Sequence, residues 1–343
     1  MNQSRVPELP TGIQLIYLAE GAANIVYRIL PSSGDIPISE LAHYAEGTPP
    51  PTEIEDPGLD RLLEGKLLRL RKDVKHALPY KENAWNFDRV IRPLFSPDEL
   101  VDQILVFLPS GLVHQRNEQL RADEKDGKRS ENRRGIYLST AEPFGLLVTD
   151  MTSSPISRFT TIEFKPKWLV QSPSAPAKSS RCRTCALREM KNQEARNAGT
   201  KEVRSFCPLD LISDKIEDVR RATQFLKGCR DQSCVTRCLY QNSTILKLQA
   251  HQSEMNDVGL YGQPPQSPSM SASMSLRDCT MFIKIPYDKS GPFEVRLGDL
   301  DLKVPSGGKA QYWLDIEKRL IQDGWYVGER MGLEGSECAL ARS

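Results

Sequence analysis

The sequence predicts an α+β protein built as one large domain or two ordinary domains. Its 343 residues are enough to bury a sizeable core. Segments that alternate with the period of a strand occur throughout the chain, and segments with helical spacing lie between them. Hydrophobic residues make up 39% of the chain and charged residues 27%, which is typical of a globular protein in water.

The N-terminal part predicts three strands and a candidate phosphate-binding turn. Leu15 to Ile29 (LIYLAEGAANIVYRI) predicts two strands joined by the turn Glu20 to Asn24. Small residues there let backbone N–H groups approach a phosphate, although an ordinary turn explains the same residues. Lys66 to Lys72 alternates as a half-buried strand whose outward Arg69 is placed to bind nucleotide phosphates. Gly145 to Met151 predicts a buried strand.

The other elements follow from the same spacing rules. Helices are predicted at Asn83 to Leu108, Arg181 to Asn197, Asp214 to Leu226 and Lys309 to Gly324, and strands at Cys279 to Ile285 and Val295 to Val304. Two segments predict irregular structure. Asn117 to Arg134 is dense in charge and indicates an exposed loop, and the low-complexity Gln263 to Ser275 indicates a disordered loop outside the core.

The segment Glu163 to Trp168 (EFKPKW) is the most informative feature of the chain. In an extended strand residues two apart share a face, so we expect Lys165 and Lys167 side by side. Two neighbouring ammonium groups favour an anion in front of them, although a solvated strand face explains the same pattern. Pro166 donates no ladder hydrogen bond and indicates an edge or terminal position.

A second candidate strand carries acidic and basic residues on one face. Asp299, Asp301 and Lys303 share that face by the same two-residue period. A carboxylate and a lysine on one strand suit a magnesium-bridged phosphate, with the acid on the metal and the ammonium group on phosphate oxygens. A cross-strand salt bridge is the alternative interpretation.

The eight cysteines are interpreted as reduced thiols. No secretory signal is visible, so we expect an intracellular protein in the nucleus or the cytoplasm. Cys182 and Cys185 form one C-x2-C pair, Cys207 lies further on, and the group from Cys229 to Cys238 contains no such pair. Structural zinc usually takes paired C-x2-C spacing or nearby histidines, so simple thiols are preferred to a zinc site.

The charge balance limits the possible partners. Lys and Arg number 46 against 45 for Asp and Glu, so the chain lacks the basic field of a nucleic-acid-binding protein. No apolar run is long enough to predict a membrane span. We expect neither a nucleic-acid nor a membrane partner, and any anion site must be a local cluster.

Together these segments resemble the inositol-pentakisphosphate 2-kinase family, most closely its fungal members. The matching segments follow the family's order along nearly the whole chain: Glu20 to Val26, Arg69 in LLRLRK, Glu163 to Trp168, Arg181 to Cys185, Cys207 to Leu211, Asp278 to Ile283 and Asp299 to Lys303. The combination of E-x-K-P-K, C-P-L-D-L and D-L-x-L-K is specific, whereas the hairpin alone carries little weight.

The resemblance implies a bilobal, protein-kinase-like α+β fold related to inositol polyphosphate kinases, with an ATP cleft between lobes at residues 1–150 and 151–343. It implies a monomeric kinase that uses ATP and Mg²⁺ to phosphorylate the 2-hydroxyl of inositol 1,3,4,5,6-pentakisphosphate, giving inositol hexakisphosphate. Two alternatives stay open. One is a kinase of a lower inositol phosphate, and the other is a non-catalytic inositol-polyphosphate-binding protein, which would need neither of the two catalytic acids.

The resemblance also implies roles for individual residues. Asp278 corresponds to the acid that takes the proton of the 2-hydroxyl, Asp299 to the magnesium-binding carboxylate, and Lys165 to a catalytic lysine. The implied ATP-binding residues are Gly21, Ala22, Ala23, Asn24, Val26, Arg69, Asp150, Met151 and Asp299. The implied inositol-phosphate-binding residues are Arg134, Lys165, Lys167, Arg183, Asp278, Lys303, Lys309 and Tyr312. Arg133 competes with Arg134 for its position.

One position departs from the family pattern. Plant members carry a basic residue four positions after Lys303, where this chain has Gly307. Lys309 is the expected substitute from a shifted position, with Tyr312 nearby.

Overall fold

The computed structural model describes residues 6–30, 61–75, 77–153, 158–228, 231–262, 267–287, 292–303, 309–328 and 337–342. The chain divides into two compact units. The first comprises Met1–Ala84 and Asp102–Asp150, and the second comprises Trp85–Val101 and Met151–Ser343. Trp85–Val101 therefore groups with the second unit although it precedes residue 150. Within the described residues, no helix has the length and apolar character needed to cross a membrane.

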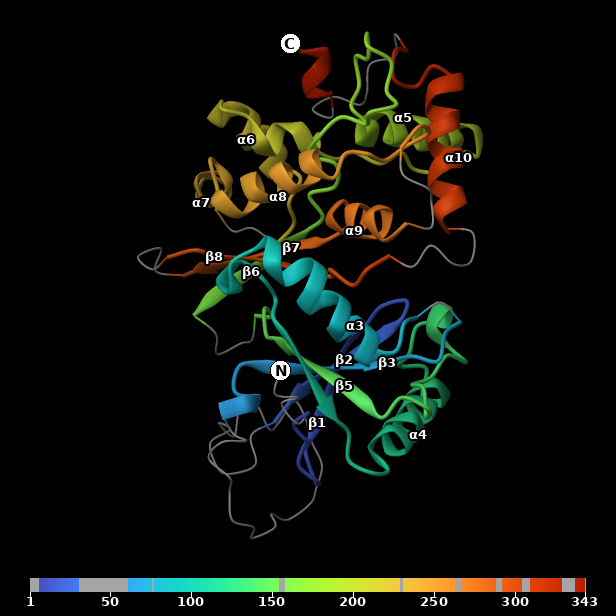
Figure 1. Cartoon of the computed structure of the whole chain (residues 1–343), viewed down its shortest axis with the longest axis vertical. Coiled ribbons are helices and arrows are strands. Elements are labelled where there is room, and N and C mark those ends of the chain that lie inside the picture. Colours follow the sequence, from blue (N-terminus) through green and yellow to red (C-terminus); the bar gives the residue numbers. More distant parts are fainter. Residues whose placement is uncertain are drawn as a thin grey trace. The chain divides into compact units, whose positions relative to one another are not determined.

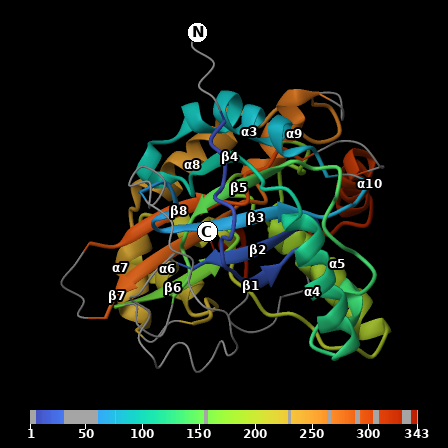
Figure 2. The same ribbon diagram turned by 90° about the horizontal axis from the view of Figure 1, so that it is seen from below.

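The first unit is built on a five-stranded antiparallel sheet in the order β1-β2-β3-β5-β4 (Figure 1). Its strands are β1 Leu15–Glu20, β2 Asn24–Ile29, β3 Lys66–Arg71, β4 Gln103–Phe107 and β5 Phe144–Thr149. Helix α4, Leu112–Lys125, packs its Leu112 and Leu120 into the same apolar core as the strands (Figures 1 and 2). The predicted hairpin and the predicted strands at Lys66 to Lys72 and Gly145 to Met151 are confirmed.

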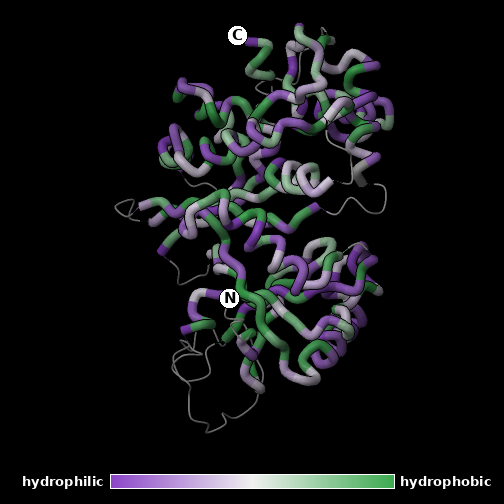
Figure 3. The backbone as a smooth tube through the Cα atoms, in the orientation of Figure 1, coloured by the Kyte–Doolittle hydropathy of each residue, from purple (hydrophilic) through white to green (hydrophobic). Residues whose placement is uncertain are grey.

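Two predictions for the segments of this unit are wrong. The last part of the predicted helix Asn83 to Leu108 is strand β4, whose apolar run QILVF pairs with β5 and buries Val106. Part of the predicted exposed loop Asn117 to Arg134 belongs to α4. That helix is mostly hydrophilic (Figure 3), and its buried Asn117 exchanges two hydrogen bonds with the backbone of Leu138. Polar contacts take the place of an apolar face in α4, so the spacing of its apolar residues did not predict a helix.

The second unit contains a three-stranded antiparallel sheet in the order β6-β7-β8, and helices α6 to α9 lie on one side of it (Figure 1). Its strands are β6 Phe159–Phe164, β7 Thr280–Pro286 and β8 Glu294–Gly298. Its longer helices are α5 Arg183–Asn197, α6 Ile216–Thr223, α7 Gln232–Leu239, α8 Ser243–Glu254, α9 Pro268–Leu276 and α10 Lys309–Gln322. Helix α3, Tyr80–Asn86, begins in the first unit and leads into a π-helical turn, Phe87–Ile91.

The prediction of a disordered loop at Gln263 to Ser275 is wrong for its larger part. Residues 263–266 lie outside the described residues, but Pro268–Leu276 forms the buried helix α9, capped by the Ser267 hydroxyl. All of its residues from Met270 to Leu276 are buried, so the helix has no polar face and no amphipathic period. Serine tolerates this burial because its hydroxyl can bond to a nearby carbonyl, as Ser273 does with the carbonyl of Met255 at 2.8 Å.

Candidate active site

The turn between β1 and β2 rests on a buried lysine that the sequence analysis missed. The turn is closed by a hydrogen bond from the Gly21 N–H to the Asn24 carbonyl, at 2.9 Å. Lys72 Nζ donates to the Gly21 carbonyl at 2.8 Å and pairs with the Glu20 carboxylate at 3.1 Å. The Lys72 side chain is fully buried. Its position at the end of an alternating strand did not predict burial, because a lysine at the end of a strand normally lies in solvent.

A buried arginine fixes the same turn from the other side. Both carboxylate oxygens of Glu20 accept hydrogen bonds from Arg129, at 3.2 and 2.9 Å. Arg129 also donates to the Glu124 carboxylate and to the Ile136 carbonyl. Burial by itself raises the pKa of Glu20, but the hydrogen bonds from Arg129 and Lys72 bring that pKa below its ordinary value. The turn is therefore held in place by ionic contacts beneath it.

The implied nucleotide-binding residues lie around this turn. Gly21, Ala22 and Ala23 form the turn itself, and Val26 on β2 pairs with Arg69 on β3. The Arg69 guanidinium donates to the Gln103 side chain at 3.1 Å.

The other residues predicted near the nucleotide are placed separately. The Asn24 side-chain oxygen accepts from the Tyr80 hydroxyl at 3.0 Å. Asp150 ends the first unit, donating its backbone N–H to Gly65, and Met151 begins the second unit. Arg134 is exposed and donates to the Arg129 carbonyl at 3.4 Å.

A cluster of opposite charges surrounds Asp278 in the second unit. Lys167 Nζ lies 2.8 Å from Asp278 Oδ1, and Lys303 Nζ lies 3.3 Å from Oδ2. Lys165 Nζ lies 3.4 Å from Oδ1, donates to the Asp278 carbonyl at 2.7 Å and pairs with Asp299 Oδ2 at 2.8 Å. We call these five residues the lysine–aspartate cluster. Segments far apart in the sequence thus bring together Lys165, Asp278 and Asp299, which were predicted for catalysis, with Lys167 and Lys303, which were predicted for acceptor binding.

The protonation of this cluster is set by its internal charges. Burial by itself raises the pKa of Asp278, but the hydrogen bond from Lys167 and the charges of Lys303, Lys167 and Lys165 lower it to about 2. Burial by itself lowers the pKa of Lys165, and the Asp299 and Asp278 carboxylates raise it above its ordinary value. Asp278 and Lys165 are therefore both charged at neutral pH.

The backbone of the lysine–aspartate cluster departs from the predicted strands. Strand β6 ends at Phe164 and β8 ends at Gly298, so four residues of the cluster follow these strands, and Asp278 precedes β7, which begins at Thr280. Lys167 has a φ of 64° and Asp299 a φ of 54°. Among the described residues only one other non-glycine residue, Gln241, has a positive φ. Such conformations are costly and concentrate at functional sites; here Lys167 contacts Asp278 and Asp299 contacts Lys165.

Helix α9 supports the segment that carries Lys303. The Ser275 hydroxyl donates to the Asp301 carbonyl at 3.1 Å and accepts from the Lys303 N–H at 2.9 Å. The Lys-Pro-Lys segment directly follows β6, an edge strand of its sheet, which agrees with the predicted edge or terminal position.

Comparison with known proteins decides what this chain is related to. The family model described as inositol-pentakisphosphate 2-kinase matches residues 17–244 and 230–319. The chain belongs to the inositol-pentakisphosphate 2-kinase family. A protein of Yarrowia lipolytica (strain CLIB 122 / E 150) named inositol-pentakisphosphate 2-kinase is 29% identical over 286 residues, covering 76% of this chain and 85% of the relative. The resemblance found in the sequence is thereby confirmed.

For the other residues predicted for the acceptor site of this 2-kinase family member, the described part of the chain shows no contact with the lysine–aspartate cluster. Arg183 is buried, with its Nε 2.8 Å from the Glu317 carboxylate and its guanidinium carbon 4.4 Å from the centre of the Trp168 ring. Tyr312 is exposed on α10. The side chain of Lys309 and the whole of Gly307 lie outside the described residues. Trp168, which the Arg183 guanidinium contacts, directly follows Lys167.

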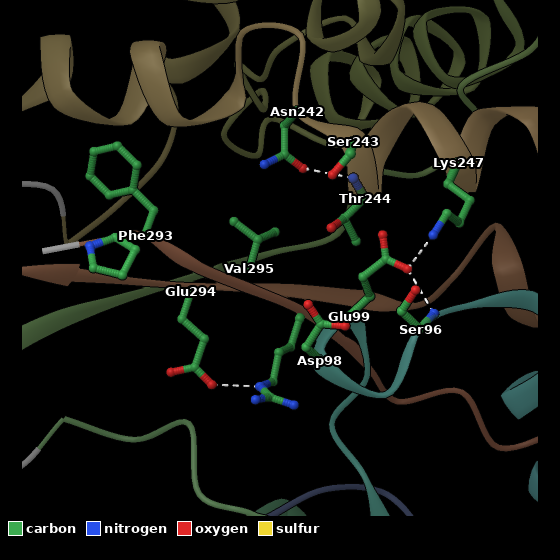
Figure 4. A pocket seen from close by; sticks show the side chains of 12 residues that line it. Ser96, Asp98, Glu99, Asn242, Ser243, Thr244, Lys247, Phe293, Glu294 and Val295 are labelled. Atoms are coloured by element: carbon green, nitrogen blue, oxygen red, sulfur yellow. Dashed lines mark hydrogen bonds and ion pairs between the residues drawn. The ribbon is translucent and has the colours of Figure 1, made fainter.

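A hollow of about 690 Å³ in the second unit lies among other residues (Figure 4). Its ionic side chains pair with each other, Lys247 with Glu99 and Arg296 with Glu294, both at 2.5 Å. The lining residues are Ser96, Asp98, Glu99, Asn242, Ser243, Thr244, Lys247, Pro292, Phe293, Glu294, Val295 and Arg296. They include none of the predicted site residues, so we assign no role in the reaction to this hollow.

Four cysteines of the second unit converge, which the sequence analysis did not predict. Cys182, Cys185, Cys207 and Cys338 are buried, and their sulfur atoms all lie within 4.8 Å of one another. The sequence spacing showed the first three, but Cys338 lies far along the chain in no recognisable motif. Of the group Cys229 to Cys238, Cys229 lies outside the described residues.

Proposed function

We propose that this protein transfers the γ-phosphoryl group of ATP to the 2-hydroxyl of inositol 1,3,4,5,6-pentakisphosphate, giving inositol hexakisphosphate. Its family membership and the name of its Yarrowia relative support this activity. The observation that carries the proposal is the lysine–aspartate cluster, in which three ammonium groups surround one carboxylate. Such a cluster can exchange its internal ion pairs for contacts with a polyanion that brings a hydroxyl group.

The cluster also suggests how substrate binding activates the base. With three lysines around it Asp278 has a pKa of about 2 and is a weak base. Phosphate groups of the acceptor compete for Lys165, Lys167 and Lys303, because each is held by a carboxylate that carries less charge than a phosphate. As the lysines turn to phosphates, the pKa of Asp278 rises toward its ordinary value. Asp278 then accepts the hydroxyl proton more readily.

The nucleotide contacts proposed for the first unit follow from its turn. The segment Gly21 to Val26 covers the phosphates, and Arg69 binds phosphate oxygens from the neighbouring strand. Lys72 and Arg129 hold the turn in position from below. We propose that the two units are the lobes of a kinase-like bilobal fold, acting as a monomer.

Magnesium fits the donors present in the lysine–aspartate cluster. Mg²⁺ takes one or two carboxylates together with phosphate oxygens and water. Asp299 is about half exposed and pairs with Lys165 through Oδ2, which leaves Oδ1 for a cation. Asp299 would hold the ion, which neutralises charge on the transferring phosphoryl group when bound.

A panel of acceptors tests this function. The purified full chain is incubated with γ-labelled ATP, Mg²⁺ and, separately, the pentakisphosphate and inositol phosphates with three or four phosphate groups. NMR of the product locates the new ester. We expect the highest kcat/KM for the pentakisphosphate, with the phosphate on the 2-position. A higher value for a lower inositol phosphate would favour the first alternative, and tight binding without any transfer would favour the non-catalytic binder.

A further inference from the structure

We propose that Gln252 of helix α8 is a positioning residue of the acceptor site, which holds the segments of Lys167 and Asp278 at the spacing that the reaction needs. The proposal rests on the proposed function, because it gives Gln252 a part in that same reaction. Helices α8 and α9 lie on the same side of the β6-β7-β8 sheet (Figure 1), and Gln252 is near the end of α8. Its side chain is completely buried, so it acts through the segments that it joins and not by touching the acceptor.

One side-chain amide connects these two segments. Gln252 Oε1 accepts a hydrogen bond from the Leu169 N–H at 2.8 Å, and Gln252 Nε2 donates to the Lys167 carbonyl at 2.9 Å. Nε2 also donates at 3.0 Å to the carbonyl of Leu276, the last residue of α9, which lies two positions before Asp278. The amide oxygen and nitrogen therefore have partners on both segments, as a buried amide requires.

The backbone of Lys167 needs such a fixed partner. The pairing of β6 with β7 ends at Phe164, and Lys167 then takes a φ of 64°. A residue with a side chain keeps this costly conformation only where neighbouring contacts enforce it. The Gln252 amide bonds to the Lys167 carbonyl and to the N–H two residues later, much as a neighbouring parallel strand would. These bonds fix the peptide groups on both sides of Trp168 and, with them, the backbone that carries Lys167.

A buried arginine connects α8 to the catalytic segment a second time. Arg277 directly precedes Asp278, and its side chain donates to the Gln252 carbonyl at 2.8 Å. The Arg277 guanidinium carbon also lies 4.6 Å from the centre of the Trp168 ring. The main chain of Gln252 thus holds the segment of Asp278, while its side chain holds both segments. Loss of the side-chain amide would let the two segments move relative to each other.

The spacing of Lys167 and Asp278 matters because the two groups act on one molecule. Lys167 Nζ lies 2.8 Å from Asp278 Oδ1. In the proposed reaction the lysine binds a phosphate group of the acceptor, and the carboxylate takes the proton of a hydroxyl on the same ring. A displacement of about 1 Å in such a site can cost on the order of a hundredfold in rate. Loss of the Gln252 amide should therefore change both the KM for the acceptor and kcat.

Gln252→Met tests the proposal, with Asn192→Leu as the matched control. Methionine keeps the length of the side chain but cannot donate to the two carbonyls. Asn192 is also a buried amide of the second unit, and it exchanges two hydrogen bonds with the Val203 backbone, at 3.1 and 2.9 Å. In Gln252→Met we expect kcat/KM for the pentakisphosphate to fall at least about tenfold, with changes in both KM and kcat, while the KM for ATP is unchanged. Asn192→Leu should keep all these parameters within about twofold of wild type, whatever its melting temperature.

A double-mutant cycle separates positioning from a general loss of stability. Partial unfolding lowers the apparent kcat but leaves the KM of the remaining folded protein unchanged. If Gln252 acts on the acceptor through Lys167, the rise in KM caused by Gln252→Met should shrink to less than about threefold when Lys167→Met is already present. Full additivity of the two substitutions, or a wild-type KM for the pentakisphosphate in Gln252→Met, would overturn the proposal.

Two measurements keep the test decisive if Gln252→Met does not fold or if wild type transfers no phosphate. A crystal structure of wild-type protein with the pentakisphosphate should show Gln252 Nε2 still bonded to the Lys167 carbonyl while Lys167 Nζ contacts a phosphate. An amide turned away from that carbonyl would overturn the proposal. An inactive wild type would contradict the proposed function alone, because calorimetry then measures the affinity of the same variants for the pentakisphosphate. Equal affinity of Gln252→Met and wild type would overturn the positioning role.

Discussion

Replacing Lys167 by Met tests the acceptor-binding role of the lysine–aspartate cluster. The substitution keeps much of the side-chain volume but removes the ammonium group that lies 2.8 Å from Asp278 Oδ1. A charge-assisted hydrogen bond contributes about 1.5–3 kcal/mol, and the Lys167 side chain is 41% exposed, which places the loss at the lower end. We expect kcat/KM for the pentakisphosphate to fall at least about tenfold.

The loss should appear mainly in KM. In the bound complex Lys167 has turned from Asp278 to a phosphate of the acceptor, so its removal takes away a binding contact and leaves the basicity of Asp278 there largely unchanged. Initial rates with labelled ATP at low and high salt measure both parameters. The wild-type KM should rise more steeply with salt than that of the variant, because one ionic contact has been removed.

Lys284→Met is the matched control for this prediction. Lys284 lies on β7 and pairs with Glu294 at 3.6 Å, outside the lysine–aspartate cluster. Its removal should leave kcat/KM within about twofold of wild type. A wild-type kcat/KM in Lys167→Met, or an equal loss in both variants, would refute the assignment and return Lys167 to the role of a solvated surface charge.

Two further predictions concern stability. Ser275→Ala leaves the Lys303 N–H without its acceptor, so we expect a loss of about 1–3 kcal/mol in urea unfolding and a raised KM, whereas Ser269→Ala in the exposed first turn of α9 should change stability by less than about 0.5 kcal/mol. The pKa of Asp278 falls from 3.8 to about 2 on folding, so its ionised form stabilises the protein above pH 4 and that stability is lost as the pH falls through about 2. Between these pH values wild type should lose about 1 kcal/mol more than Asp278→Asn, a value reduced for solvent screening; equal acid unfolding would contradict this.

The sequence predicted the elements that have one buried face. Strand β3 alternates cleanly because Leu68 and Leu70 enter the core while Arg69 stays half exposed. Helix α9 was not predicted because it is buried on all sides. Its buried serine hydroxyls form hydrogen bonds to carbonyl groups inside the protein. Helix α4 escaped because it is stabilised by polar contacts, so that its charges suggested a loop. The spacing of apolar residues predicts a helix where an apolar face contrasts with a polar one, and neither α4 nor α9 has this contrast.

The sequence named the residues of the lysine–aspartate cluster but did not predict their geometry. Motifs identified Lys165, Lys167 and Asp278, yet the expected reason, a shared strand face, is wrong for the lysines. The strand ends before them, and the positive φ of Lys167 breaks the two-residue period. Lys72 and Cys338 could not be predicted, because their partners lie far away in the sequence and only the folded chain brings them together.

The most direct test of the acceptor site is Asp278→Asn, measured for turnover and binding on one preparation. The amide keeps the shape of the side chain but cannot take the hydroxyl proton, and it removes a negative charge beside a polyanion. Turnover of labelled ATP with the pentakisphosphate should fall about a hundredfold or more, while calorimetry should show unchanged or tighter binding of the pentakisphosphate. Normal turnover would contradict the assignment of Asp278 as the base, and loss of binding together with folding would show that Asp278 is a structural acid.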